Sequence, residues 1–238
     1  SSPRESIPQL SYKVLSYDTR IGLLTQNVQT SGMTGTLKAF VRPPPQSQRT
    51  FLELSEHVKK GEFSDQTALI IGGSRGLGEV TGKLLAAGGA RIVICYHMGS
   101  EEAQTIVKQV QEEHGEAICL AYDVLCPKLP QNCAIGGDWQ PTHLYYFATP
   151  KISQGKKNSF SPSLFKNFCD YYVTGFLNTF QTFQAMGKEL QGIFYPSTIF
   201  INELQPGLAE YASAKSAGET LCAYLRKTLT SMNIYAPR

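Results

Sequence analysis

The sequence predicts an α/β fold in which a small β-rich extension precedes a parallel, doubly wound sheet. From Gln66 onward, short apolar segments alternate with longer amphipathic segments, which is the pattern of strands joined by crossover helices. Before Val41, short strand-like segments are separated only by turn residues, which is the pattern of an antiparallel sheet. We therefore expect the extension and a linker over residues 1–65 and the main domain over residues 66–238.

Three segments of the extension predict an antiparallel meander: residues 12–17, 21–28 and 36–41. Turn residues at 18–20 and 31–35 separate these segments. The prolines at 43–45 end the third strand, because proline cannot donate to a strand ladder. A short helix is expected over residues 51–60, with Gly61 at its end.

The main domain is expected to contain six strands and four helices. The strands are residues 67–71, 90–96, 117–122, 142–148, 192–200 and a sixth that begins at 233–235. The helices are residues 78–87, 101–114, 165–190 and 210–232. Helices of this length between strands imply βαβ crossovers and therefore a parallel sheet.

Composition predicts a globular, cytoplasmic protein. Of the 238 residues, 42% are hydrophobic and 17% charged, and the net charge of +3 falls short of a nucleic-acid-binding footprint. The N-terminal residues lack the apolar core of a signal peptide, and no apolar run could span a bilayer. The six cysteines form no CxxC motif and have no histidines at metal-site spacing, so we expect reduced thiols and no metal.

A glycine-rich segment, Gly72-Gly-Ser-Arg-Gly-Leu-Gly78, follows the first expected strand of the main domain and opens its first helix. Glycines at such a turn let the backbone approach a pyrophosphate, and the helix N-terminus supplies N–H groups and partial positive charge. This position favours a dinucleotide-binding loop over an ordinary turn. The expected cofactor contacts in the loop are Gly72, Ser74, Arg75, Gly76, Leu77 and Gly78.

Far downstream of this loop lies a Tyr-x-x-x-Lys motif, Tyr211 to Lys215. The GxxxGxG spacing of the loop, together with this motif, resembles the short-chain dehydrogenase/reductase family over Gln66 to Arg238. The resemblance implies a Rossmann-type fold and an NADP-dependent oxidoreductase of the ketoreductase kind. Ile71 stands where the family usually has Thr before the first glycine, which is a structural position.

Tyr211 and Lys215 are the expected proton-transfer pair. Residues four apart on a helix share a face, so their side chains project together. A free tyrosine has a pKa of about 10 and is a poor acid–base catalyst at neutral pH, but a nearby ammonium stabilises the phenolate. The resemblance implies that Tyr211 protonates the carbonyl oxygen as hydride arrives, and that Lys215 also holds the nicotinamide ribose.

A hydroxyl that orients the substrate carbonyl is expected near the end of the fifth strand. Thr198 has the family's usual separation from Tyr211, and Ser197 is one residue off, so both are candidates. The catalytic Asn of the family aligns with Tyr172, which cannot anchor the same water. The usual proton relay is therefore in question.

The choice of nicotinamide cofactor depends on the residues after the second strand. That strand ends at Cys95-Tyr-His-Met98 without the carboxylate that holds the ribose 2′-OH of NAD. Arg75 can meet the 2′-phosphate of NADPH, with help from His97. Further contacts implied by the resemblance are Asp123, Val124 and Ala148, although the Asn-Asn-Ala-Gly of the family is here Tyr-Phe-Ala148-Thr149.

The leading expectation is an NADPH-dependent ketoreductase that acts on a 3-oxoacyl-type thioester in fatty-acid or polyketide-like biosynthesis. Extended members of the superfamily use the same pair for sugar-nucleotide epimerisation or dehydration, and this is an alternative. A degenerate reductase fold that serves as a scaffold or cofactor sensor is another; the departures at Ile71, Thr149 and Tyr172 favour it, whereas Tyr211 and Lys215 argue against it.

Two features suggest that the chain works with further parts. The family continues past its sixth strand with a substrate-covering segment and a seventh strand, which we expect residues 66–238 to lack. The stretch from Gly35 to Pro45 loosely resembles the end of a hot-dog-type acyl dehydratase. A fused or associated dehydratase, or a homo-oligomer, is therefore a possible partner; a β-rich extension of the reductase is the equal alternative.

Overall fold

The computed structural model describes residues 10–20, 22–41, 48–129, 133, 135–152, 155, 159–186 and 189–238. The chain divides into two compact units, Ser1–Ser47 and Gln48–Arg238. Residues 48–65, which the sequence pattern grouped with the extension, belong to the second unit. They contribute the buried side chains of Phe51 and Leu54.

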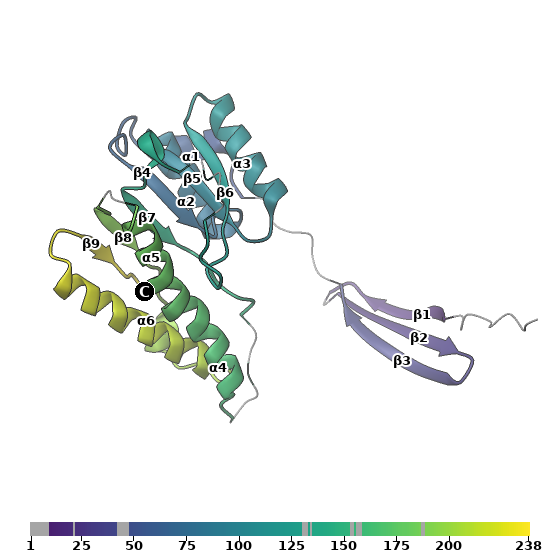
Figure 1. Cartoon of the computed structure of the whole chain (residues 1–238). Coiled ribbons are helices and arrows are strands. Elements are labelled where there is room, and N and C mark those ends of the chain that lie inside the picture. Colours follow the sequence, from purple (N-terminus) through teal and green to yellow (C-terminus); the bar gives the residue numbers. More distant parts are fainter. Residues whose placement is uncertain are drawn as a thin grey trace, which may run out of the picture. The chain divides into compact units, whose positions relative to one another are not determined.

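The first unit is a three-stranded antiparallel sheet, as expected (Figure 1). Its strands are β1 (Ser11–Asp18), β2 (Leu23–Thr30) and β3 (Met33–Phe40). The turn expected over residues 31–35 is shorter, because Thr30 already pairs with Met33. The expected start of the second strand at Ile21 and the prolines at 43–45 lie outside the described residues.

The second unit contains a six-stranded sheet in the order β6-β5-β4-β7-β8-β9, and every neighbouring pair is parallel. The strands are β4 (Thr67–Ile71), β5 (Arg91–Tyr96), β6 (Ala117–Ala121), β7 (His143–Tyr146), β8 (Gly192–Phe194) and β9 (Asn233–Tyr235). The chain runs outward from β4 to β6 and then crosses back to β7. This order confirms the Rossmann-type, doubly wound fold. It places a crevice at the carboxyl ends of the neighbouring strands β4 and β7, because the chain continues from these two strands in opposite directions along the sheet.

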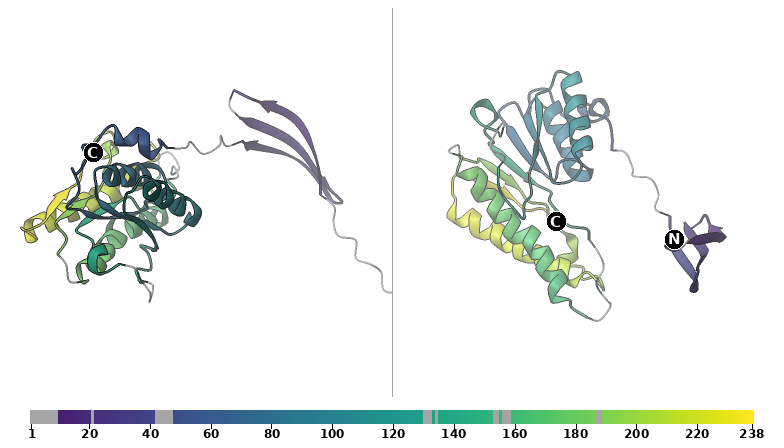
Figure 2. Two further views of the ribbon diagram at one scale, coloured as in Figure 1. Left: turned by 90° about the horizontal axis from the view of Figure 1, so that it is seen from above. Right: turned by 45° about the vertical axis from the view of Figure 1, so that its right-hand side comes forward.

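Helices cover the sheet on both sides. They are α1 (Phe51–Ser55), α2 (Gly76–Ala87), α3 (Ser100–Glu112), α4 (Pro162–Cys169), α5 (Phe176–Gln184) and α6 (Ala209–Thr228), with a π-helical segment η2 (Asp170–Gly175) and the short 3-10 helices η1 (Gly137–Trp139) and η3 (Ile199–Ile201). Helices α2 and α3 pack on one face, through the core that holds Ile70, Ile92 and Ile94. Helices α4 to α6, green and yellow in Figure 2, pack on the other face.

Three expected elements differ most in extent from those observed. The helix expected over residues 51–60 ends at Ser55; a capping box between Thr50 and Glu53 starts it. The strand expected over residues 192–200 pairs only as far as Phe194. Proline at position 196 cannot continue the ladder, and a 3-10 turn follows.

The third difference is the helix expected over residues 165–190. It begins at Pro162, where Ser161 caps it, and ends at Gln184. Its middle, η2, is π-helical, a geometry that is rare and often found at functional sites. In this stretch the carbonyl of Tyr171 accepts a hydrogen bond from the Tyr146 hydroxyl at 2.6 Å. The sequence pattern predicts the helix but carries no signal for the change of pitch.

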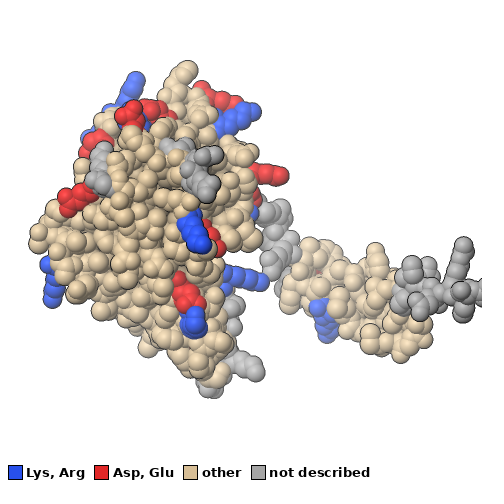
Figure 3. Space-filling view, in the orientation of Figure 1, with Lys and Arg blue, Asp and Glu red and all other residues tan. Residues whose placement is uncertain are grey.

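Other broad expectations concern charge and sulfur. Basic and acidic side chains are mixed over the visible face of the larger unit, which fits the mild net charge (Figure 3). The six cysteines are free thiols, and Cys95 and Cys222 are fully buried. Among the described residues, no helix is long and apolar enough to cross a bilayer, and no cluster of side chains could hold a metal ion.

Candidate functional site

A cavity of about 700 Å³ opens at the carboxyl ends of the parallel strands. Its walls come from the loops that follow β4, β5, β6, β7 and β8, and from α6. Because all these strands run in one direction, their following loops gather at one edge of the sheet. The cavity lies in the crevice where ligands of this fold class bind.

The glycine loop forms one side of the cavity, and close backbone contacts require glycine at its first and last positions, Gly72 and Gly78. Gly72 has a positive φ of 75°, and a Cβ there would lie 3.0 Å from the carbonyl group of Phe147. A Cβ at Gly78 would lie 2.4 Å from the carbonyl oxygen of Gly72. No side chain caps the start of α2 after Arg75. The loop thus offers a close backbone approach and a helix N-terminus, which suit a phosphate.

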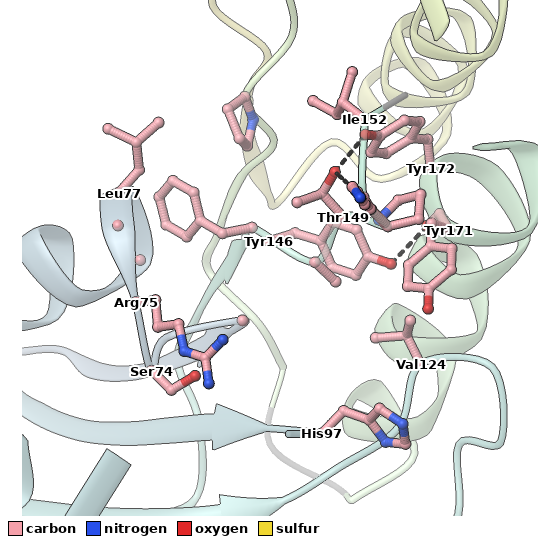
Figure 4. A pocket seen from close by; sticks show the side chains of 18 of the residues that line it. Ser74, Arg75, Leu77, His97, Val124, Tyr146, Thr149, Ile152, Tyr171 and Tyr172 are labelled. Atoms are coloured by element: carbon pink, nitrogen blue, oxygen red, sulfur yellow. Dashed lines mark hydrogen bonds between the residues drawn. The ribbon is translucent and has the colours of Figure 1, made fainter. Parts of the chain in front are cut away.

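Arg75, Ser74 and His97 lie together at one end of the cavity (Figure 4). The guanidinium of Arg75 donates from Nε and Nη2 to one oxygen of Glu102, at 3.1 and 2.6 Å. His97 Nδ1 lies 3.7 Å from Asp123. Both basic side chains are more than half exposed, so these ion pairs are weak and their partners can be exchanged.

The floor between the two ends is largely apolar. Val124, Phe147 and Ala148 line it, and the amide of Phe147 bonds to the carbonyl of Ile71 at 2.8 Å, which fixes the loop after β7 against the glycine loop. Asp123 also lines the cavity, and its carboxylate accepts a hydrogen bond from the Leu125 amide. This stretch has the mixture of apolar surface and few polar groups that is usual in cofactor pockets.

Tyr211 and Lys215 project from α6 into the other end of the cavity. Both are more than nine-tenths buried. Lys215 Nζ donates to the carbonyl oxygen of Pro196 at 2.7 Å and lies over the rings of Tyr172 and Tyr195. Burial lowers the pKa of Lys215 to about 8, with smaller opposing effects from Cys222 and Glu219.

The two candidate hydroxyls have different surroundings. Ser197 lines the cavity, and its hydroxyl donates to Glu219, whose pKa is lowered mainly by the hydrogen bond from Arg238. Thr198 is buried beside the cavity but does not line it, and its hydroxyl accepts from the Phe200 amide at the start of η3. The geometry thus favours Ser197 for contact with a substrate.

The cavity brings together nearly all the residues singled out from the sequence. Those that line it are Gly72, Ser74, Arg75, Gly76, Leu77, Gly78, His97, Asp123, Val124, Ala148, Ser197, Tyr211 and Lys215. Thr198 is the exception. Sequence reasoning missed Tyr195, Pro196 and Glu219. The position of Tyr195-Pro196 directly before Ser197 could have drawn attention to the first two, and the position of Glu219 four residues after Lys215 on one helix could have drawn attention to the third.

A protein-family model described as short chain dehydrogenase matches residues 66–236. Among curated proteins, a 3-oxoacyl-[acyl-carrier-protein] reductase from Synechocystis is 39% identical over 59 residues. This match covers 25% of the chain and 24% of that reductase, so it spans about a quarter of the relative's length.

Solved structures share the fold. FolM alternative dihydrofolate reductase 1 from Brucella suis, in complex with NADP, has a TM-score of 0.63 at 16% identity, over 73% of this chain and 72% of that chain. The angucycline C-6 ketoreductase LanV with bound NADP has a TM-score of 0.64 at 17% identity, over 75% of this chain and 73% of that chain. A short chain dehydrogenase from Burkholderia cenocepacia in complex with NADP has a TM-score of 0.62 at 23% identity, over 73% of this chain and 72% of that chain.

The family model covers most of the chain, from the first strand of the parallel sheet to its last. The glycine loop and the Tyr211–Lys215 pair both fall within the matched residues and line one cavity. The solved structures agree with this assignment at the level of fold. The chain belongs to the short-chain dehydrogenase family.

Proposed function

We propose that the chain binds NADPH in this cavity and reduces a ketone, with Tyr211 as the proton donor. The observation that carries the proposal is the single cavity that joins the glycine loop at one end to Tyr211 and Lys215 at the other. A dinucleotide has its pyrophosphate in the middle and its adenine and nicotinamide at opposite ends. A cavity that runs from a phosphate-binding loop to Tyr211 and Lys215 therefore suits the pyrophosphate and the nicotinamide half. Three similar structures were solved with NADP, which supports the choice of cofactor.

The residues of the loop fit the phosphate groups of the cofactor. The pyrophosphate would approach the backbone at Gly72 and Gly78, where a side chain would meet other backbone atoms, and would face the first turn of α2. Arg75 would meet the 2′-phosphate, assisted by His97. Asp123, Val124 and Ala148 would contact the adenosine half. At the other end, Lys215 would hold the nicotinamide ribose.

The bound cofactor supplies a hydride to the carbonyl carbon. Tyr211 gives its phenolic proton to the carbonyl oxygen, so that the ketone becomes an alcohol and the tyrosine becomes a phenolate. The ammonium of Lys215 stabilises that phenolate. The hydroxyl of Ser197 turns from Glu219 and donates its single hydrogen bond to the carbonyl oxygen instead.

The substrate that we favour is a 3-oxoacyl thioester. The short match to a 3-oxoacyl-[acyl-carrier-protein] reductase supports this class. Ile152, an exposed apolar side chain that lines the cavity near its reactive end, suits an acyl chain better than a sugar nucleotide (Figure 4).

Tyr211→Phe tests the chemistry. We expect NADPH oxidation with a panel of 3-oxoacyl thioesters to fall about 10²- to 10⁴-fold, because the proton donor is lost. NADPH binding, followed by fluorescence, should stay close to that of the wild type. Tyr224→Phe is the matched control, since Tyr224 is an exposed tyrosine on the same helix. Turnover that survives Tyr211→Phe would refute the mechanism.

Glu102→Gln tests the assignment of Arg75 to the 2′-phosphate. The carboxylate of Glu102 holds Arg75 and would repel that phosphate. Its removal should tighten NADPH binding about two- to fivefold, because exposed charge pairs are worth roughly 0.2–1 kcal/mol. NADH binding should not change.

The control for Glu102→Gln is Glu116→Gln, which removes a similar exposed ion pair with Arg91. Arg75→Ala should act in the opposite sense and weaken NADPH while it leaves NADH unaffected. If NADH and NADPH respond equally to both changes at the Arg75–Glu102 pair, Arg75 does not read the 2′-phosphate.

Ser197→Ala and Thr198→Ala distinguish the two hydroxyls. We expect Ser197→Ala to lower kcat/KM about 10- to 100-fold, which corresponds to roughly 1.4–2.7 kcal/mol of lost transition-state stabilisation. Thr198→Ala should leave kcat/KM nearly unchanged, because the hydroxyl of Thr198 accepts a hydrogen bond from the Phe200 amide in the 3-10 turn η3. The reverse order of the two variants in steady-state kinetics would identify Thr198 as the active hydroxyl.

A further inference from the structure

The ammonium group of Lys215 lies between two aromatic faces. Its Nζ is 4.1 Å from the ring centroid of Tyr172 and 4.8 Å from that of Tyr195. The hydrogen-bond acceptor found for it among the described residues is the carbonyl oxygen of Pro196. An ammonium has three N–H donors, so the two rings occupy directions in which a buried lysine would otherwise need polar partners.

The ring of Tyr172 is fixed in place by contacts at its edge. Its hydroxyl lies 2.5 Å from Oγ1 of Thr149, which leaves the ring face to Lys215 (Figure 4). Phe168 stacks on the ring at 5.9 Å between centroids, and Tyr211 meets it edge-on at 5.7 Å. Tyr172 is 1% exposed. It therefore has little freedom to turn away from the lysine.

The second ring is held by the π-helical segment and by α6. The Tyr195 hydroxyl donates to the carbonyl oxygen of Tyr172 at 2.9 Å. A Cβ at Gly218 would lie 2.0 Å from the same hydroxyl oxygen. Only glycine at position 218, one turn after Lys215 on the helix, leaves room for Tyr195 against α6.

Cations over aromatic faces are stabilised by the ring quadrupole, and more strongly where water is excluded. The other titratable groups around Lys215 are Tyr211, Glu219 and Cys222. Glu219 attracts the ammonium. However, Arg238 forms an ion pair with Glu219 at 2.5 Å, which neutralises much of the negative charge of that carboxylate. The two rings therefore offset part of the desolvation that opposes a charged lysine at this position.

We propose that Tyr172 and Tyr195 form an aromatic enclosure that positions Lys215 and keeps it charged, and that Tyr172 is a positioning residue for proton transfer at Tyr211. The inference rests on the proposed function for its catalytic meaning, but the enclosure itself belongs to the fold. In place of an amide that anchors a water, this chain presents a ring face to the ammonium. Tyr172 acts through Lys215 and need not touch the substrate.

The test is lysine NMR on the whole chain labelled with ¹³C and ¹⁵N at lysine, with the Lys215 signal assigned by its loss in Lys215→Met. Protons next to Nζ that lie over ring faces are displaced upfield, so the wild type should show one lysine Hε signal well upfield of the others. Tyr172→Phe should keep this displacement, because it keeps the ring. Tyr172→Leu should lose most of it.

A pH titration of the same signal measures the effect of the Tyr172 ring on the pKa of Lys215. In Tyr172→Leu the pKa of Lys215 should fall, with about a tenfold change in the protonation equilibrium. In Tyr172→Phe it should stay near that of the wild type. The alkaline limb of kcat/KM for reduction should move to lower pH in Tyr172→Leu only, an effect that a loss of packing alone would not produce.

The outcomes are distinguishable from failure of the proposed function, because the NMR measurement needs neither cofactor nor turnover. An unshifted Lys215 signal in the wild type would overturn the enclosure. An unchanged pKa in Tyr172→Leu would overturn its role in holding the charge. If Tyr172→Leu does not fold, Tyr172→Met takes its place, since its unbranched side chain fills the space without a ring.

Discussion

The buried ammonium of Lys215 is the group on which the reactive end of the cavity depends. A lysine that is only 6% exposed can remain charged only if its surroundings replace water around the ammonium. Two parts of the chain provide that replacement: the segment after β8, with the ring of Tyr195 and the carbonyl of Pro196, and η2, with the ring of Tyr172. The lysine therefore ties α6 to the π-helical segment and to the end of the sheet.

The same arrangement explains two local features that otherwise look irregular. The π-helical geometry of η2 accompanies backbone carbonyls, those of Tyr171 and Tyr172, that accept hydrogen bonds from tyrosine hydroxyls. The short β8 leaves Pro196 outside the ladder, with its carbonyl available to Lys215. In each case a departure from regular structure provides a contact that the proposed chemistry needs.

Much of the fold could be predicted from the sequence, because its signals are local. Strand β4 and the helix after it follow from an apolar run and a glycine loop, and the Tyr211–Lys215 spacing predicts one shared helix face. The pitch of η2 could not be predicted, since it depends on partners far along the chain. The same holds for the choice between Ser197 and Thr198, which differ only in what the folded chain puts beside them. For Tyr172, the sequence indicates only that the Asn of the family is missing at this position; the contact of its ring with Lys215 is visible only in the folded chain.

The proposed function requires that the cavity hold NADPH with its nicotinamide end at Tyr211 and its 2′-phosphate at Arg75. A crystal structure of the chain grown with NADP⁺ tests this most directly. We expect the pyrophosphate over the first turn of α2, the 2′-phosphate within hydrogen-bond distance of Arg75, and the nicotinamide ribose beside Lys215. A cofactor bound outside this cavity, or in the reverse orientation with its adenine end at Tyr211, would contradict the account.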